Sequence, residues 1–192
     1  MKRIAIYIVM SLLIYPLLSP ITLFAGEVKL TDARLTNHEG KLLLSLKAQG
    51  CFTKEMEDVI VSGIPTTFTF KIKLDRARRF RRDEKIARLK IDHTIKFDNL
   101  KCNFRISLSE RSKDIIVNEF SEAKEIMRSL TNVVVISTKE LQKDVRYRLK
   151  AKAELNKVEL PFYLHYVFFF VRLWNFETDW ITINFTPSEL LS

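Results

Sequence analysis

The order of apolar and polar residues predicts a chain made mainly of β-strands. In residues 66–74, four apolar side chains occupy alternate positions and are separated by threonines and lysines: Phe68, Phe70, Ile72 and Leu74. Because successive side chains of a strand point to opposite faces, this segment has one buried and one solvated face. Residues 144–155 alternate in the same way, with mostly basic polar positions. Six further segments favour strands: 28–35, 41–48, 86–97, 102–108, 133–136 and 178–185.

Two segments predict short helices. Residues 53–62 begin with Thr53, which can cap a helix, and are followed by Gly63, which suits the position after the last turn. Residues 121–130 begin with Ser121 as a cap and place apolar residues three or four positions apart, so that these share one face.

The fold class follows from these elements. Residues 27–187 predict one mainly β domain, an antiparallel two-layer β-sandwich-like arrangement with two short helices. Residues 37–40 predict a hairpin turn between the first two strands, because Gly40 is free to take a positive φ. An open sheet with both helices packed on one face is the alternative arrangement.

Residues 1–25 predict a signal peptide or an N-terminal membrane anchor. Lys2 and Arg3 precede an apolar run that carries no charge until Glu27. Cleavage after Ala25 would release the domain, whereas the uncut run is long enough to span a bilayer. Both outcomes place the domain in the periplasm or at the periplasmic face of the inner membrane.

The charge of the chain points to anionic partners. It has 32 lysine and arginine residues against 23 aspartate and glutamate residues, a net charge of +9 at pH 7. Such an excess favours binding to lipid head groups, acidic polymers or acidic proteins. The alternative is that it serves only to keep the protein soluble. Nucleic acid is not expected as a partner, because the leader exports the domain. With four glycines, the chain has neither a phosphate-cradling loop nor a nucleophile elbow.

Six stretches of the chain occur together in a recognisable order: residues 31–35, 63–74, 82–86, 120–130, 159–161 and 174–180. The last two are the most specific, Glu-Leu-Pro followed by Trp-Asn-Phe-Glu-Thr-Asp-Trp. Over nearly all of residues 27–187 the chain resembles the bacterial Domain of Unknown Function 4390 family. The resemblance implies an exported protein with no assigned activity, cofactor or active site. Members are often encoded beside a membrane sensor kinase, which implies a membrane-protein partner of that kind.

An arginine run follows the clearest strand and is the first candidate binding site. Its five arginines lie within seven residues, around Phe80: Arg76, Arg78, Arg79, Arg81 and Arg82. The similar family usually has tryptophans in this segment. Guanidinium groups bind phosphate and carboxylate through paired hydrogen bonds, so the run predicts contact with an anionic surface. A single flat patch requires a bulge or loop here, and the alternative is a solvated strand end whose charge prevents edge pairing.

A second basic set lies on the polar face of residues 144–155. Its members alternate along the strand: Arg146, Arg148, Lys150 and Lys152. They predict a further contact with an anionic surface, and the alternative is an ordinary solvated sheet face.

Two other features allow opposite interpretations. Cys51 and Cys102 predict a disulfide in an oxidising compartment, or else two separate buried thiols. Residues 162–174 are the most hydrophobic part of the domain and predict either a core segment or an exposed element that contacts a membrane or a partner.

Catalytic and metal-binding chemistry has no support in the sequence. The three histidines are isolated and lack metal-ligand spacing. Asp92 and His93 have the chemistry of a base and its orienting group, but neighbouring residues of a strand point to opposite faces. No catalytic residue, metal site or cofactor is therefore predicted.

The sequence thus predicts a non-enzymatic envelope module that binds an anionic membrane surface or a membrane-protein partner through its basic segments. One rival is a periplasmic hydrolase or lipid-handling protein with an unrecognised site, which a cleft gathering His93 or His165 with carboxylates would favour. Another is a sandwich that holds an apolar molecule between its layers, in a cavity lined by residues 168–170.

Overall fold

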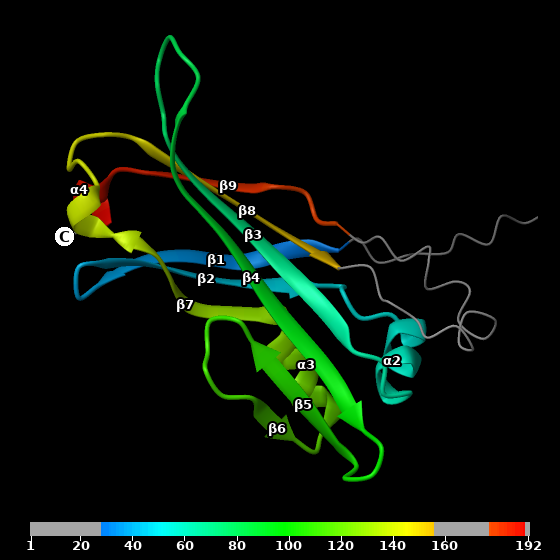
Figure 1. Ribbon diagram of the computed structural model, residues 1–192. Coiled ribbons are helices and arrows are strands. Elements are labelled where there is room, and N and C mark those ends of the chain that lie inside the picture. The colour runs from blue at the N-terminus through cyan, green and yellow to red at the C-terminus, as the bar shows by residue number, and fades with distance from the viewer. Residues whose placement is uncertain (1–27, 156–176, 191–192) are drawn as a thin grey trace, which may run out of the picture.

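The computed structural model describes residues 28–155 and 177–190, which form two antiparallel sheets. The smaller sheet has the strand order β1-β2-β7, and the larger sheet has the order β6-β5-β4-β3-β8-β9. Figure 1 shows the sheets as two layers, with α3 lying behind β5 and α2 beyond the end of β2. The predicted two-layer antiparallel β-sandwich-like fold is confirmed, and the single open sheet is not the arrangement observed.

A strand or helix forms at every predicted segment, although β7 begins four residues earlier and β9 three residues later than predicted. In chain order the strands are β1 (Lys29–His38), β2 (Lys41–Gln49), β3 (Thr66–Arg76), β4 (Glu84–Asp98), β5 (Asn103–Leu108), β6 (Ile115–Val117), β7 (Ser129–Ser137), β8 (Tyr147–Leu155) and β9 (Ile181–Phe185). The helices are α2 (Lys54–Val61), α3 (Phe120–Arg128) and α4 (Pro187–Leu190), with a 3₁₀ turn, η2, at Thr138–Glu140. The sequence pattern missed β6, because three residues are too few to display an alternation.

β3 is central to the larger sheet and carries much of its buried face. It pairs with β4 on one side and with β8 on the other. Its four alternating apolar residues are at most 1% exposed: Phe68, Phe70, Ile72 and Leu74. On β8 the residues paired with them are also buried: Leu155, Ala153, Ala151 and Leu149. The alternation predicted for both strands is therefore confirmed.

The start of β8 differs from the prediction by three residues. The strand begins at Tyr147 and not at residue 144. The backbone N–H of Val145 donates to the carbonyl of Gln142 at 3.3 Å, so the chain still turns at this point. Alternation of side chains alone does not reveal such a turn, because it contains no glycine or proline.

α2 has the predicted ends. The Thr53 side chain accepts a hydrogen bond from the backbone N–H of Met56 at 3.3 Å, which caps the first turn. Gly63 follows the helix with a φ of +82°, a conformation that glycine adopts without strain.

α3 begins one residue earlier than predicted, and its cap is different. Glu119 occupies the capping position and makes no side-chain capping bond, so Ser121 lies inside the first turn. The helix also ends earlier, because β7 begins at Ser129 and pairs there with β2. Tertiary pairing, which the local sequence does not encode, sets this boundary.

Within the part of the chain that the structure describes, no helix has the length and apolar character needed to cross a bilayer. The predicted leader and the apolar residues 162–174 lie outside the described residues.

Replacing Gly63 by alanine should destabilise the fold in two ways. An alanine strains the positive φ, and its Cβ would lie 2.9 Å from Asn99 Nδ2 and 3.4 Å from the carbonyl oxygen of Phe97. We expect the free energy of unfolding, measured by urea denaturation, to fall by about 1–2 kcal/mol. Gly40→Ala is the matched control, because Gly40 has a φ of +71° but only an ordinary contact at 3.7 Å with Thr138. An equal loss in both variants would contradict the contact with Asn99.

Candidate functional site

The arginine run forms the loop of the hairpin between β3 and β4. Residues 77–83 connect the two strands, and Figure 1 shows this loop projecting beyond the ends of the other strands. A single basic patch requires that the run leave the regular strand conformation, and this loop does so. Because β3 lies between β4 and β8, its end is not a sheet edge, and the interpretation of the run as a charged guard against edge pairing is wrong.

Two carboxylates fix the base of this loop. Glu84 Oε2 lies 3.3 Å from Arg76 Nη1 and 2.5 Å from Arg78 Nη2. Asp83 accepts a hydrogen bond from the backbone N–H of Arg78 at 3.2 Å and pairs with Arg148 of β8 at 2.5 Å. Both strands of the hairpin are thus tied together at the base, and Asp83 also ties the loop to β8.

The tip of the loop carries the unneutralised part of the run. Arg79, Arg81 and Arg82 are exposed, and none has a carboxylate partner among the described residues. Phe80 lies between them with 90% of its surface exposed, and the Arg79 guanidinium carbon is 5.7 Å from the centre of its ring. An exposed aromatic ring among free guanidinium groups is suited to an interface between water and an anionic surface. We refer to residues 79–82 as the arginine tip.

Half of the second predicted basic set is neutralised by ion pairs. Arg146 precedes β8 and is exposed, whereas the other three members lie on the face of β8 that points away from the core. Arg148 pairs with Asp83, as described above. Lys152 bonds to Glu177 and lies 3.4 Å from Glu154.

The pKa values follow from these contacts. The hydrogen bond that Lys152 donates to Glu177 raises the pKa of Lys152 and lowers the pKa of Glu177. Lys150 is the strand residue of the set that has no carboxylate partner among the described residues. Since ion pairs already satisfy its neighbours, the β8 face is a weaker candidate than the arginine tip.

The structure contains both cysteines as free thiols and does not form the predicted disulfide. Cys51 is buried beside the carbonyl of Ala48, whereas Cys102 is exposed in the turn between β4 and β5. The alternative of two buried thiols is therefore wrong for Cys102. Burial raises the pKa of the Cys51 thiol to about 11.

A hydrogen-bonded pair of a buried histidine and a more exposed glutamate links three parts of the fold. His93 is fully buried on β4, with Nδ1 3.0 Å from the carbonyl oxygen of Met127 in α3 and Nε2 3.0 Å from Glu110 Oε1. A carbonyl oxygen only accepts, so Nδ1 carries a proton and donates it. Nε2 and the carboxylate then share one further proton. Asp92 lies on the opposite face, as predicted, where it accepts from Thr69 at 2.5 Å.

No pattern in the sequence predicts this pair, because Glu110 follows β5 and approaches His93 only through the pairing of β4 with β5. A histidine gathered with a carboxylate is what the hydrolase rival requires. Both ring nitrogens of His93 are nevertheless occupied, and the side chain has no exposed surface. The imidazole is therefore closed to a substrate in this structure, and its two hydrogen bonds join β4 to α3 and to the segment after β5.

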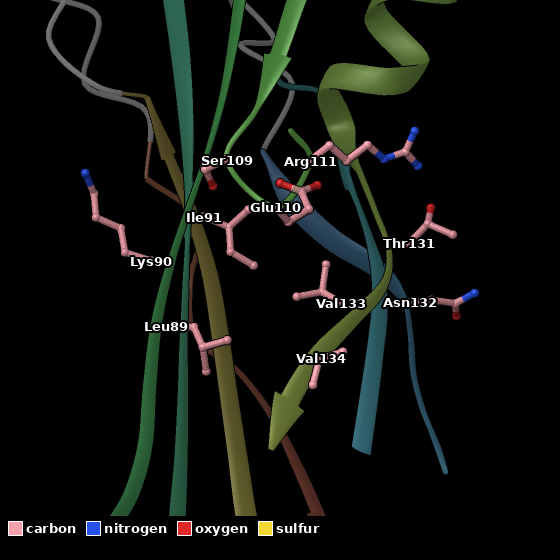
Figure 2. Close-up of a pocket in the computed structure, with 10 residues that line it drawn as sticks. All are labelled: Leu89, Lys90, Ile91, Ser109, Glu110, Arg111, Thr131, Asn132, Val133 and Val134. Atoms are coloured by element: carbon pink, nitrogen blue, oxygen red, sulfur yellow. The ribbon is translucent and has the colours of Figure 1, made fainter. Parts of the chain in front are cut away.

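A hollow of about 420 Å³ opens beside this pair, between β4 and β7. In Figure 2, Leu89 and Ile91 of β4 face Val133 of β7 across it, and Glu110 lies at one end. These apolar side chains share its lining with polar and charged residues, and the Glu110 carboxylate is already bonded to His93. The apolar cavity lined by residues 168–170, which the ligand-holding alternative requires, lies outside the described residues. Among residues 28–155 and 177–190, no three histidine, cysteine or acidic side chains are placed to hold a metal ion.

The fold and the site together define a two-layer β domain whose most distinctive surface feature is a projecting, arginine-rich hairpin. The family model described as "Domain of unknown function (DUF4390)" matches residues 25–184, and the chain belongs to this family. The resemblance seen in the sequence is thereby confirmed. No curated protein and no solved structure matches the chain.

Thiol labelling should distinguish the two cysteines. We expect iodoacetamide at pH 8 to modify Cys102 in the native protein and to leave Cys51 unmodified, because Cys51 is buried and its raised pKa keeps it protonated. Peptide mass spectrometry would locate the label, and unfolding in urea should expose the second thiol. Labelling of neither cysteine without prior reduction would indicate a disulfide and contradict the structure.

Loss of the Glu110 carboxylate should cost stability. Glu110→Ala leaves Nε2 of the buried His93 without a partner, and we expect the free energy of unfolding to fall by about 1–3 kcal/mol. Glu110→Gln keeps a hydrogen-bonding group and should cost less. Glu140→Ala is the control, since Glu140 is exposed and makes no ion pair in the described part of the chain. Urea midpoints that are the same for all three variants would argue against the pair.

Proposed function

We propose that this protein is an exported, non-enzymatic envelope module that binds an anionic lipid membrane through the arginine tip of the β3–β4 hairpin. The observation that carries the proposal is the exposed ring of Phe80 among three arginines that have no carboxylate partner in the described residues. The charged and then apolar N-terminal sequence supports export, and thereby a location beside a membrane.

The shape of the tip favours a lipid surface over a folded protein as the partner. A convex loop with one apolar side chain at its end requires either a matching pocket or an interface that deforms around it. A bilayer deforms, and its head-group region accepts aromatic rings and guanidinium groups at the same depth. The arginines point to phosphate because their planar groups form paired hydrogen bonds with it.

The expected strength of this contact is modest. Each arginine near an anionic membrane contributes about 1 kcal/mol, and burial of one phenylalanine side chain contributes about 1.5–3 kcal/mol. The total of about 5 kcal/mol corresponds to a dissociation constant of a few tenths of a millimolar. A single tip therefore gives a reversible, salt-sensitive contact, which a second attachment in the same molecule would strengthen.

The variant Arg79→Gln/Arg81→Gln/Arg82→Gln tests the proposal. We expect its partitioning onto vesicles that contain phosphatidylglycerol to fall about 100-fold, since three charges of about 1 kcal/mol each are lost. Flotation of the full chain with vesicles would measure the bound fraction at low and high salt. Binding of the wild type should weaken with salt, whereas any binding by the apolar N-terminal residues should not.

Three controls separate the tip from the overall charge. Lys113→Gln/Lys139→Gln/Lys143→Gln removes the same charge from exposed lysines elsewhere and should leave binding nearly unchanged. Phe80→Ser should weaken binding at every salt concentration. Glu84→Gln releases Arg76 and Arg78 from their ion pairs and should strengthen binding. If the wild type binds zwitterionic and anionic vesicles equally, or if both triple variants lose binding equally, the proposal is wrong.

A further inference from the structure

A second exposed apolar residue lies at the opposite end of β4 from the arginine tip. Residues 99–102 form the turn between β4 and β5, and Leu100 within it is 96% exposed. The neighbouring Phe97 and Phe104 rings pack against each other. The inner side of the hairpin therefore offers apolar contacts. Leu100 instead points away from the core, where water gives its side chain no favourable contact.

Three cations surround this turn without a carboxylate partner in the described part of the chain. Lys96 and Arg105 lie directly opposite each other on β4 and β5, and Lys101 is next to Leu100. Like charges in opposite positions of paired strands destabilise a sheet unless an anion lies nearby. We refer to Lys96, Leu100, Lys101 and Arg105 as the lysine tip.

The one carboxylate beside this tip is engaged by the backbone. Asp98 accepts hydrogen bonds from the N–H groups of Lys101 at 3.1 Å and of Leu100 at 3.0 Å. The bond from Lys101 and the bond from Leu100 hold the pKa of Asp98 below its usual value. Asp98 therefore shapes the turn that presents Leu100, and its one charge, which the nearby Lys101 and Arg105 also attract, offsets only part of the charge of the three cations.

A hollow beside the lysine tip has room for a head group. It measures about 470 Å³ and lies between the β4–β5 turn and the end of α2. Lys96 and Arg105 line it, together with Asp98, Asn99 and Gly63. Two cations on the wall of a hollow, with an exposed leucine at its border, fit a phosphate head group and its adjoining acyl region.

We propose that the lysine tip is a second contact for anionic phospholipid, and that the two tips together bridge two membrane surfaces. The first contact of the bridge rests on the function proposed above. β4 has 15 residues, and at about 3.3 Å per residue it separates the tips by about 45 Å. Figure 1 shows the two hairpin loops at opposite ends of the molecule, so each tip extends away from the other along the strand direction.

Vesicle clustering distinguishes a bridge from a single contact. The full chain would be mixed with two populations of phosphatidylglycerol-containing vesicles that carry a donor and an acceptor dye, and clustering would be followed by energy transfer and dynamic light scattering. We expect Leu100→Glu/Lys101→Glu to reduce clustering about tenfold while flotation still recovers bound protein, because the arginine tip is intact. The arginine-tip triple variant should lose clustering as well.

Lys139→Glu/Lys143→Glu is the control, matched in charge to Lys96→Glu/Arg105→Glu, and should cluster vesicles as the wild type does. Lys96→Glu/Arg105→Glu is an independent lysine-tip variant, and far-ultraviolet circular dichroism and urea midpoints would verify that all variants fold. If the lysine-tip variants cluster vesicles as well as the wild type, the bridge is refuted. If the wild type binds anionic vesicles without clustering them, the bridge again fails while the proposed function stands. If the wild type binds no vesicles, both fail together.

Discussion

The packing of the inner face of β3 is the constraint on which the rest of the structure depends. Phe68, Phe70, Ile72 and Leu74 are all buried, and β4 and β8 pair with the strand on either side. Because each residue of a strand points opposite to the next, the burial of these four also fixes which residues reach the outer face. A shift of register by one residue would bury lysines and expose phenylalanines. The ends of the hairpin, and thus the arginine tip, are positioned by this register.

Charge on the outer face of the larger sheet is organised by the same register. Lys71 pairs with Glu154 at 2.5 Å, Lys90 with Asp92 at 2.9 Å, and Arg88 with Asp75. Such exposed pairs contribute little stability each, but they leave few cations free for an external anion. The two hairpin loops at the ends of β4 differ from the sheet face. Each has cations that form no ion pair with a described carboxylate, together with one exposed apolar residue. This contrast within one molecule is the reason for assigning contacts to the loops and not to the sheet face.

Two weak binding contacts in one molecule give a higher overall affinity than one contact alone. A contact of a few tenths of a millimolar is rapidly reversible, but linking it to a second contact raises the effective concentration of each. The buried His93 holds β4, the strand between the two tips, against α3 through its hydrogen bond to Met127. A stiff, well-packed strand keeps its two ends apart, whereas a mobile linker would let both tips reach one surface.

The sequence by itself determined the fold class, most strand positions and the hairpin turn at Gly40, since these depend on side-chain periodicity and on local φ preferences. It also determined which residues could bind an anion. The tertiary structure decided which of them remain free: Glu84 neutralises Arg76 and Arg78, Asp83 neutralises Arg148, and Glu177 neutralises Lys152. It likewise decided the separation of the two cysteines and the pairing of His93 with Glu110. The physical reason is that alternation is a property of one strand, whereas ion pairs and buried hydrogen bonds join residues that only sheet pairing and loop closure bring within about 3 Å.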